Sequence, residues 1–170
     1  MRFKKIKITS DEKIHLEYEK INKKHEWDDF SMTSSEKALP EFYEALTDLA
    51  KFVCEMCELP DTDIGRIKVR GVSFSYAGEN DTMGAVITAQ KELIHSNCPL
   101  NINTPHKTED FYAENGDEKQ LLPTGCVEFL NAICGKAERY LSGERSQMNL
   151  FQEEKKEKQN KEVLPEEIGF

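Results

Sequence analysis

The pattern most informative about the fold lies in Ile67-Lys68-Val69-Arg70-Gly71-Val72-Ser73-Phe74-Ser75-Tyr76. Apolar and polar residues alternate on both sides of Gly71, which is the period of a half-buried β-strand. The phase slips at Gly71, so that Ile67 and Val69 have one parity and Val72 and Phe74 have the other. A β-bulge at Gly71 would return both sets to one face of a sheet. We therefore expect a long strand with a bulge near its middle.

Further strands are expected after this one. Gly78-Glu79-Asn80-Asp81 has the composition of a turn, and Ala85-Val86-Ile87-Thr88-Ala89 is apolar enough for a central strand. Residues 93–104 are expected to add another strand, which Pro99 interrupts because proline has no N–H for the ladder. The polar stretch 105–120 is predicted to be a long loop.

The N-terminal region has the period of a β-hairpin. Apolar residues recur in residues 3–8 and alternate with polar residues in 14–19, with a plausible turn at Asp11-Glu12-Lys13. Residues 27–32 are expected to form a third strand.

Two helices are predicted from apolar stripes with a period near that of an α-helix. The first begins at Pro40, whose missing N–H costs nothing in a first turn, and ends at Leu59-Pro60-Asp61. Its stripe consists of Phe42, Leu46, Leu49, Val53 and Cys57. The second helix runs from about Pro123 to Leu141 and stops at Gly143. Its stripe consists of Cys126, Leu130, Ile133, Ala137 and Leu141.

The expected element order is therefore βββαβββα. We predict an α+β fold in which a mostly antiparallel sheet has two helices packed on one face, because this arrangement buries both helical stripes. A single domain is expected over residues 1–143. Residues 144–170 are predicted to form a C-terminal peptide and a flexible charged tail, since no apolar period is present from Gln152 onward.

The composition is that of a water-soluble chain. Of the 170 residues, 38% are hydrophobic and 32% are charged, and no apolar run approaches the length of a membrane span. The basic N-terminus lacks the apolar stretch of a secretion signal. Five cysteines, an odd number, in a chain without such a signal favour reduced thiols. We therefore expect a cytoplasmic protein with no membrane partner.

The net charge of −9 is unevenly distributed. Residues 1–25 carry eight Lys or Arg against four Asp or Glu, whereas residues 26–63 carry two against eleven. An acidic domain is a poor nonspecific ligand of nucleic acid, because neutralised phosphates supply most of that affinity. A local contact of the basic N-terminal segment with a nucleic-acid backbone stays open. So does the simpler interpretation that these charges are solvated faces of amphipathic elements.

Two cysteines have the spacing of a metal or redox pair. Cys54-Glu55-Met56-Cys57 has the C-x-x-C form, but a tetrahedral site needs two more ligands, for which His95 and Cys98 are the candidates. At the end of a helix the dipole also disfavours a thiolate. We therefore expect structural cysteines, with a metal-dependent enzyme kept as an alternative.

Pairs of carboxylates are the other residues with the chemistry of metal or acid–base sites. They are Asp28-Asp29, Asp61-x-Asp63 and Glu109-Asp110. The first lies on an expected strand, where neighbours point to opposite faces, and the others lie in loops, where acidic residues are ordinary. Neither a metal nor a cofactor is expected.

No catalytic motif stands out. The chain contains no G-x-S-x-G, Walker loop, G-x-G-x-x-G or H-E-x-x-H sequence, so a protein that is not an enzyme is expected. His106-Lys107 has groups that can bind an anion, although such a pair in a loop is usually ordinary surface. Phe74 and Tyr76 would suit base stacking in a single-strand binder, whereas strand aromatics more often belong to a core.

The most specific short sequence of the chain is Gln147-Met148-Asn149-Leu150-Phe151. It resembles the bacterial sliding-clamp-binding pentapeptide, whose pattern is Gln-Leu-(Ser/Asp)-Leu-Phe. Gln147, Leu150 and Phe151 match, Met148 replaces a leucine, and Asn149 departs mildly. The resemblance implies that Leu150 and Phe151 fill an apolar pocket of the clamp and that Gln147 hydrogen-bonds at its edge. Alternatively, Leu150 and Phe151 fold back and cap the core of this chain.

Longer phrases of the chain resemble small uncharacterised proteins of phages and prophages of Gram-positive bacteria. They are Gly84-Ala85-Val86-Ile87-Thr88-Ala89, Asn103-Thr104-Pro105 and Gly143-Glu144-Arg145-Ser146-Gln147. The leading hypothesis is a phage-type accessory protein of DNA replication, recombination or repair that docks on the host sliding clamp through Gln147, Met148, Leu150 and Phe151. Two alternatives stay open. One is a single-stranded nucleic-acid-binding protein, and the other is an acidic inhibitor or decoy of a host nucleic-acid-handling or defence protein, with residues 26–63 as its contact.

Overall fold

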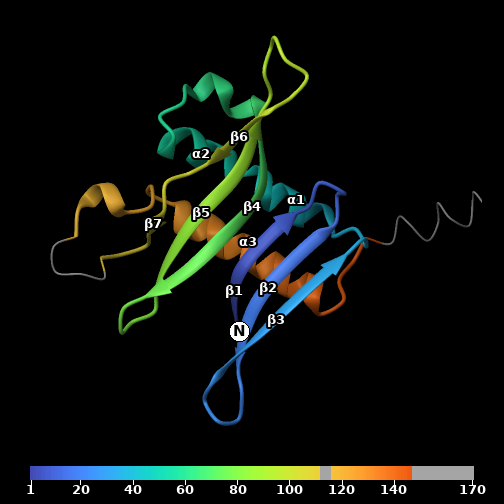
Figure 1. Ribbon diagram of the computed structural model, residues 1–170, viewed down its shortest axis with the longest axis vertical. Helices are drawn as coiled ribbons and strands as arrows, with labels where there is room; N and C mark the ends of the chain where they lie inside the picture. Colours follow the sequence, from blue (N-terminus) through green and yellow to red (C-terminus); the bar gives the residue numbers. More distant parts are fainter. Residues whose placement is uncertain (112–115, 147–170) are drawn as a thin grey trace, which may run out of the picture.

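The computed structural model describes residues 1–111 and 116–146, which form a sheet with helices on one face (Figure 1). The strands run in the order β3-β2-β1-β4-β5-β6, and a short β7 also pairs with β5; all these pairs are antiparallel. The N-terminal strands are β1 (Arg2–Ile8), β2 (Ile14–Ile21) and β3 (Trp27–Ser34). The others are β4 (Ile67–Ala77), β5 (Thr82–Lys91), β6 (Leu100–Asn103) and β7 (Lys107–Thr108).

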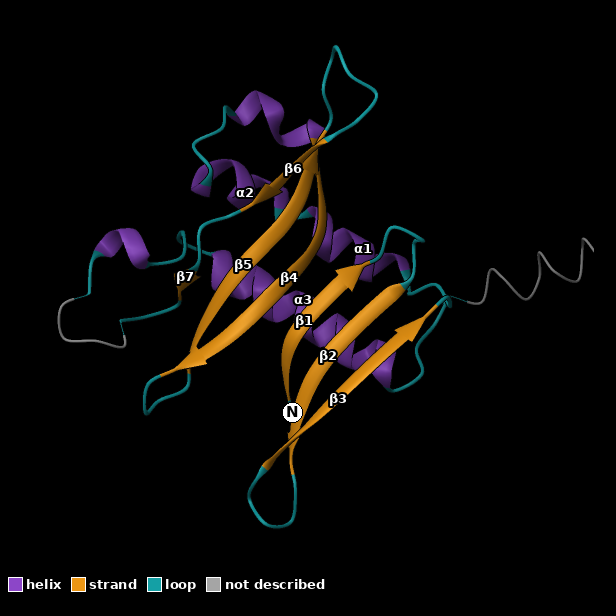
Figure 2. Cartoon of the chain, in the orientation of Figure 1, coloured by secondary structure: helices purple, strands orange, loops and turns teal. Residues whose placement is uncertain are grey.

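Within the described residues, three α-helices cover one face of the sheet (Figure 2). They are α1 (Pro40–Thr47), α2 (Ala50–Met56) and α3 (Cys126–Leu141). Two short 3-10 helices, η1 (Asp61–Arg66) and η2 (Glu118–Gln120), lie in the connections. The predicted α+β class with a mostly antiparallel sheet is confirmed, and the predicted number of two helices is wrong by one.

The additional helix arises because the expected helix of residues 40–57 is interrupted. The N–H of Leu49 donates to the carbonyl of Leu46, three residues back, at 3.1 Å, which tightens the chain by the geometry of a 3-10 turn. Asp48 and Leu49 still have right-handed helical backbone angles. The apolar stripe therefore continues across the junction, and both Leu49 and Val53 are fully buried.

The core lies between the helices and the sheet, and a row of aligned residues crosses its centre. Leu16, Ile6, Val72 and Ile87 are successive cross-strand partners on β2, β1, β4 and β5. Their exposed fractions are 0% to 1%. Side chains alternate between faces along a strand, so the neighbours of these residues point to the opposite side. We name that side the open face; it carries Lys5, Lys7, Ser73 and Thr88.

The bulge expected at Gly71 is confirmed. Val69 pairs with Ala89 and Gly71 pairs with Thr88, so Arg70 is the extra residue of β4. Val69 and Val72 are consequently both buried in the core. Arg70 is also buried, and its guanidinium donates to the carbonyl of Thr9 at 2.6 Å and to Glu12 at 3.0 Å. This contact fastens the β1–β2 turn to β4 and lowers the pKa of Glu12.

Helix α3 begins three residues later than predicted and buries a different last residue. Gly125 has φ of +84°, a left-handed conformation that no helical residue has, so the helix starts at Cys126. Tyr140 is 1% exposed and its hydroxyl donates to the carbonyl of Glu36, whereas Leu141 is only half-buried. The rest of the predicted stripe of α3 is buried.

The region after β5 differs most from expectation. Residues 93–99 belong to no strand, and β6 covers only the four residues after Pro99. The predicted loop of residues 105–120 contains β7, which pairs at Gly84 and Ala85 of β5. A two-residue strand has too few positions for a period, so periodicity along the chain carries no signal for it.

The close approach of β1 at the bulge predicts that a side chain at Gly71 destabilises the fold. A Cβ at this position would lie 2.5 Å from the carbonyl oxygen of Ile6 and 3.0 Å from the Cα of Lys7, and neither backbone atom can move without disturbing the β1–β4 pairing. We expect Gly71→Ala to lower the free energy of unfolding by about 2 kcal/mol or more. Urea denaturation measures this difference.

Gly135 provides the matched control. It lies in the interior of α3 and is exposed, and a Cβ at this position would have no other atom within 4 Å. Gly135→Ala is therefore expected to raise the free energy of unfolding by about 0.5–1 kcal/mol. Equal effects of the two substitutions would contradict the close approach of β1 and β4 at Gly71.

Candidate functional site

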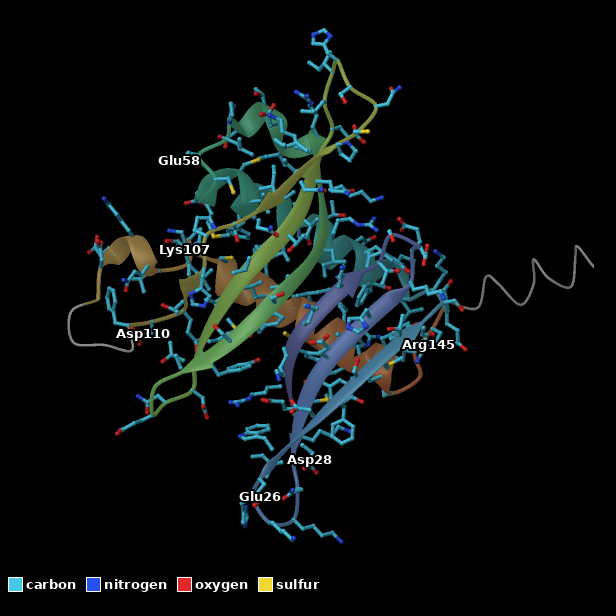
Figure 3. All side chains as sticks on the ribbon, in the orientation of Figure 1. Glu26, Asp28, Glu58, Lys107, Asp110 and Arg145 are labelled. Carbon is cyan, nitrogen blue, oxygen red and sulfur yellow. The ribbon has the colours of Figure 1, made fainter. Side chains whose placement is uncertain are left out.

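The predicted partner-binding residues Gln147, Met148, Leu150 and Phe151 lie outside the described residues, which end at Ser146. The segment that leads to them is held against the domain. The guanidinium of Arg145, labelled in Figure 3, lies 3.6 Å from the ring centroid of Tyr140 and 2.7 Å from a carboxylate oxygen of Glu36. The N–H of Ser146 donates to the carbonyl of Lys37 at 2.9 Å. Ser146 therefore lies beside the connection between β3 and α1.

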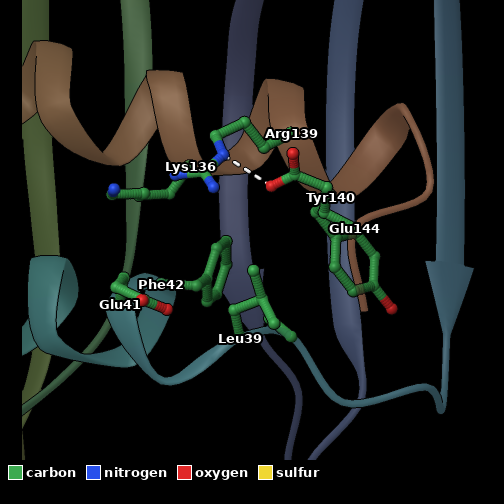
Figure 4. Close-up of a pocket in the computed structure, with 8 residues that line it drawn as sticks. Leu39, Glu41, Phe42, Lys136, Arg139, Tyr140 and Glu144 are labelled. Carbon is green, nitrogen blue, oxygen red and sulfur yellow. Dashed lines mark hydrogen bonds and ion pairs between the residues drawn. The ribbon is translucent and has the colours of Figure 1, made fainter. Parts of the chain in front are cut away.

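A small apolar cavity lies beside this segment, between α1 and α3 (Figure 4). Leu39, Phe42 and Tyr140 contribute to its walls, and an ion pair between Arg139 and Glu144 lies at its rim. Its volume is about 10 Å³, which is the space of about one water molecule. A leucine or phenylalanine side chain does not fit into this cavity.

In the described part of the chain, the three helices carry no large hydrophobic side chain that is exposed. The exposed large hydrophobic residues of the described chain belong to strands, loops and the N-terminus instead. They are Met1, Ile21, Trp27, Phe30, Leu93, Ile94, Leu100 and Phe111. None of them lies on α1, α2 or α3.

The C-x-x-C cysteines lie at the end of α2 and face the interior. Cys54 is buried and Cys57 is half-buried, and burial raises the pKa of both thiols. Burial also raises the pKa of Cys126 and of Cys134 to about 12. Across residues 1–111 and 116–146, no group of three or more His, Cys, Asp or Glu side chains is arranged to hold a metal ion. The burial agrees with the structural role expected of Cys54 and Cys57.

His106 and Lys107 make separate contacts. The Nε2 of His106 lies 2.7 Å from the hydroxyl oxygen of Ser75, in a space that a Cβ at Gly84 would fill. Lys107 donates to the carbonyl of Lys119. A serine–histidine pair resembles half of a nucleophilic site, but such a site also needs a group that orients the histidine. None of the hydrogen bonds among the described residues supplies one.

The two aromatic residues of β4 pack on the core side of the sheet. Phe74 is 8% exposed and lies in the core beneath the helices. The hydroxyl of Tyr76 donates to the carbonyl of Phe3 at 2.7 Å, and burial raises the pKa of Tyr76 to about 12. The burial of Phe74 and the hydrogen bond of Tyr76 give no support to base stacking on these two rings, and the single-strand-binding alternative stays a prediction.

The acidic residues of 26–63 do not form one continuous surface. Figure 3 shows Glu26 and Asp28 at the tip of the β2–β3 hairpin and Glu58 near the opposite end of the molecule. A smaller group lies together, because Glu41, Glu44 and Asp48 are exposed and spaced three and four residues apart along α1 and its C-terminal cap.

Sequence reasoning missed a hollow on the open face, on the seam where β1 pairs with β4. Its volume is about 140 Å³, and we name it the seam hollow. Its lining consists of Lys5, Ile6, Lys7, Gly71, Val72, Ser73 and Thr88. The sequence shows that Lys5 and Lys7 alternate with Ile6 and therefore point to the opposite face of a strand. It does not show that β1 pairs with β4.

None of the helices in the described part of the chain is long and apolar enough to cross a membrane. No family model, curated protein or solved structure matches the chain.

The cysteine burial predicts a simple pattern of chemical reactivity. Cys98 is exposed, whereas Cys54 and Cys126 are buried. We expect iodoacetamide at neutral pH to modify Cys98 at least about tenfold faster than the other four thiols, because protonated, buried thiols react slowly. Peptide mass spectrometry measures the rates, and unfolding in urea should expose all five. Rapid modification of Cys54 and Cys57 in the folded protein would contradict their structural role.

Proposed function

We propose that this chain is a phage-type, cytoplasmic accessory protein of DNA replication, recombination or repair, and that it is not an enzyme. It docks on a bacterial sliding clamp through Gln147-Met148-Asn149-Leu150-Phe151. Leu150 and Phe151 are the apolar anchors, Met148 adds apolar contact, and Gln147 hydrogen-bonds at the rim of the pocket. The observation that carries the proposal is the match of this pentapeptide to the clamp-binding pattern.

The point at which the peptide begins supports this proposal. Arg145 and Ser146 are fastened to Glu36 and Lys37 by an ion pair and a backbone hydrogen bond. A docking peptide that follows a fixed residue is presented from one defined corner of the domain.

The alternative, in which Leu150 and Phe151 cap the core, gains no support from the described residues. The cavity between α1 and α3, which Glu144 helps to line, has a volume of about 10 Å³, far below that of either side chain. Most of the two helical stripes is already buried, with Phe42 and Leu46 at 2% exposure, and Tyr140 beside them is 1% exposed. The helical layer therefore needs no further apolar cover.

A binding titration with purified bacterial sliding clamp tests this proposal. Leu150→Ala/Phe151→Ala is expected to weaken binding by at least about thirtyfold, because loss of an anchor residue commonly costs about 2 kcal/mol or more. Val163→Ala/Leu164→Ala removes an apolar pair of the same C-terminal segment outside the pentapeptide, and it should bind as tightly as the unmodified protein. Binding that is absent, or equal in all three proteins, would refute clamp docking.

A second candidate function is supported by the acidic side of α1. Glu41, Glu44 and Asp48 are exposed on one side of the helix and its cap, and none of the ion pairs among the described residues involves them. A row of unpaired carboxylates can occupy a basic groove that normally binds nucleic acid. The chain would then inhibit a host nucleic-acid-handling or defence protein as a decoy.

Affinity capture from host lysate distinguishes this candidate. The decoy should retain a basic nucleic-acid-binding protein that added duplex DNA displaces, and Glu41→Gln/Glu44→Gln/Asp48→Asn should lose it. The control variant neutralises three exposed carboxylates elsewhere, namely Glu79→Gln/Glu118→Gln/Glu128→Gln, and should retain it. Equal retention by both variants would count against the decoy.

A further inference from the structure

The seam hollow collects cationic and hydroxyl groups from two strands that are far apart in the sequence. Lys5 and Lys7 lie on β1, and their cross-strand partners on β4 are Ser73 and Gly71. Ile6 and Val72, between them, point into the core and are 0% and 1% exposed. The two ammonium groups and the Ser73 hydroxyl therefore belong to the open face, next to Gly71, which has no side chain.

Gly71 creates the space at the centre of this group. Its Cα approaches β1 so closely that a Cβ would lie 2.5 Å from the carbonyl oxygen of Ile6. Gly71, which has no side chain, is one of the residues that line the depression of about 140 Å³. Thr88 forms its far wall, with a hydroxyl that donates to Asn103 at 2.9 Å.

The cations around the hollow make no direct ion pair in the described part of the chain. Neither Lys5 nor Lys7 takes part in an ion pair there. The carboxylate that faces Lys5 across the strands is Glu17. Glu17 accepts a hydrogen bond from His15 at 2.9 Å. This bond is the main reason that the pKa of Glu17 is lowered, and the nearby charge of Lys5 lowers that pKa further. Lys5 is therefore partly balanced by Glu17, whereas Lys7 has no carboxylate as a cross-strand partner. The pair keeps capacity for an external anion.

We propose that the seam hollow binds the oxyanion of a phosphate monoester or diester. Lys5 and Lys7 supply the positive charge, and Ser73 supplies a hydroxyl donor. Lysine ammonium groups are strong donors to phosphate oxygens, and such charge-assisted bonds exceed neutral ones in strength. This site lies on the domain itself and does not depend on residues 147–151.

The size of the hollow decides which part of a ligand it holds. Pockets that enclose a whole cofactor or drug-sized molecule have volumes of about 300–1,000 Å³. The seam hollow, at about 140 Å³, has room for a phosphate group but not for an attached nucleoside. The remainder of the ligand would lie along the open face. Polar contacts are available there from Lys68 on β4, from its cross-strand partner Gln90 on β5, and from Asn101, the partner of Gln90 on β6.

Titration with inorganic phosphate, followed by amide NMR shifts at constant ionic strength set with chloride, tests the site. We expect saturable shifts centred on Lys7, Gly71 and Ser73. The variant Lys5→Gln/Lys7→Gln should weaken binding at least about tenfold, the factor that corresponds to about 1.4 kcal/mol. Ser73→Ala should weaken it less. Shifts that do not saturate, or that are centred elsewhere, would overturn the proposal.

Lys13→Gln/Lys23→Gln is the charge-matched control, because it removes two lysines from the turns next to β2. It should bind phosphate as tightly as the unmodified protein. Equal weakening in both double variants would show that the lower net charge alone weakens binding, and this would overturn the site. A parallel titration with a short oligothymidylate identifies the source of the phosphate. Tighter, Lys5- and Lys7-dependent binding of the strand assigns the site to a nucleic-acid backbone. Equal or weaker binding assigns it to a free phosphate compound.

Discussion

The pairing of β1 with β4 is the contact on which the rest of the structure depends. It has three aligned positions, and Ile6 faces Val72 at its centre. The row continues to Leu16 and Ile87, so one line of buried side chains crosses both halves of the sheet. Without this seam the chain would contain two separate sheets, β1–β3 and the strands from β4 onward, and each would need its own cover for its apolar face. A shift of one residue would turn Ile6 toward solvent.

The bulge beside this seam has consequences on both faces of the sheet. On the helical face it keeps the apolar residues before and after it in one core. The extra residue, Arg70, leaves the ladder and holds the β1–β2 turn through Thr9 and Glu12. On the open face, Gly71 lets β1 approach closely and leaves the space between Lys5 and Lys7. The seam hollow is thus a geometric result of the same close approach that aligns the core.

Local periodicity predicted the parts of the fold that repeat over several residues. The alternation in β2 and β4, the bulge and most of the α3 stripe follow from it, because each reflects the burial of one face. Features that depend on distant partners were not predictable. Tyr140 replaces Leu141 in the core because its hydroxyl reaches Glu36, and the seam hollow requires the register of β1 on β4. Neither partner can be identified from spacing along the chain.

The net charge of −9 is a sum over the whole chain. It does not give the local charge on the outer side of the helical layer or on the open face of the sheet. The carboxylates of α1 are on the outer side of the helical layer, and Lys5 and Lys7 are on the open face of the sheet. A helix about 10 Å in diameter and the sheet itself lie between them, a separation larger than the Debye length of about 8 Å at physiological ionic strength. The two groups therefore act on partners almost independently. An acidic composition disfavours nonspecific nucleic-acid binding by the whole protein, yet it leaves a single phosphate site on the open face electrostatically favourable.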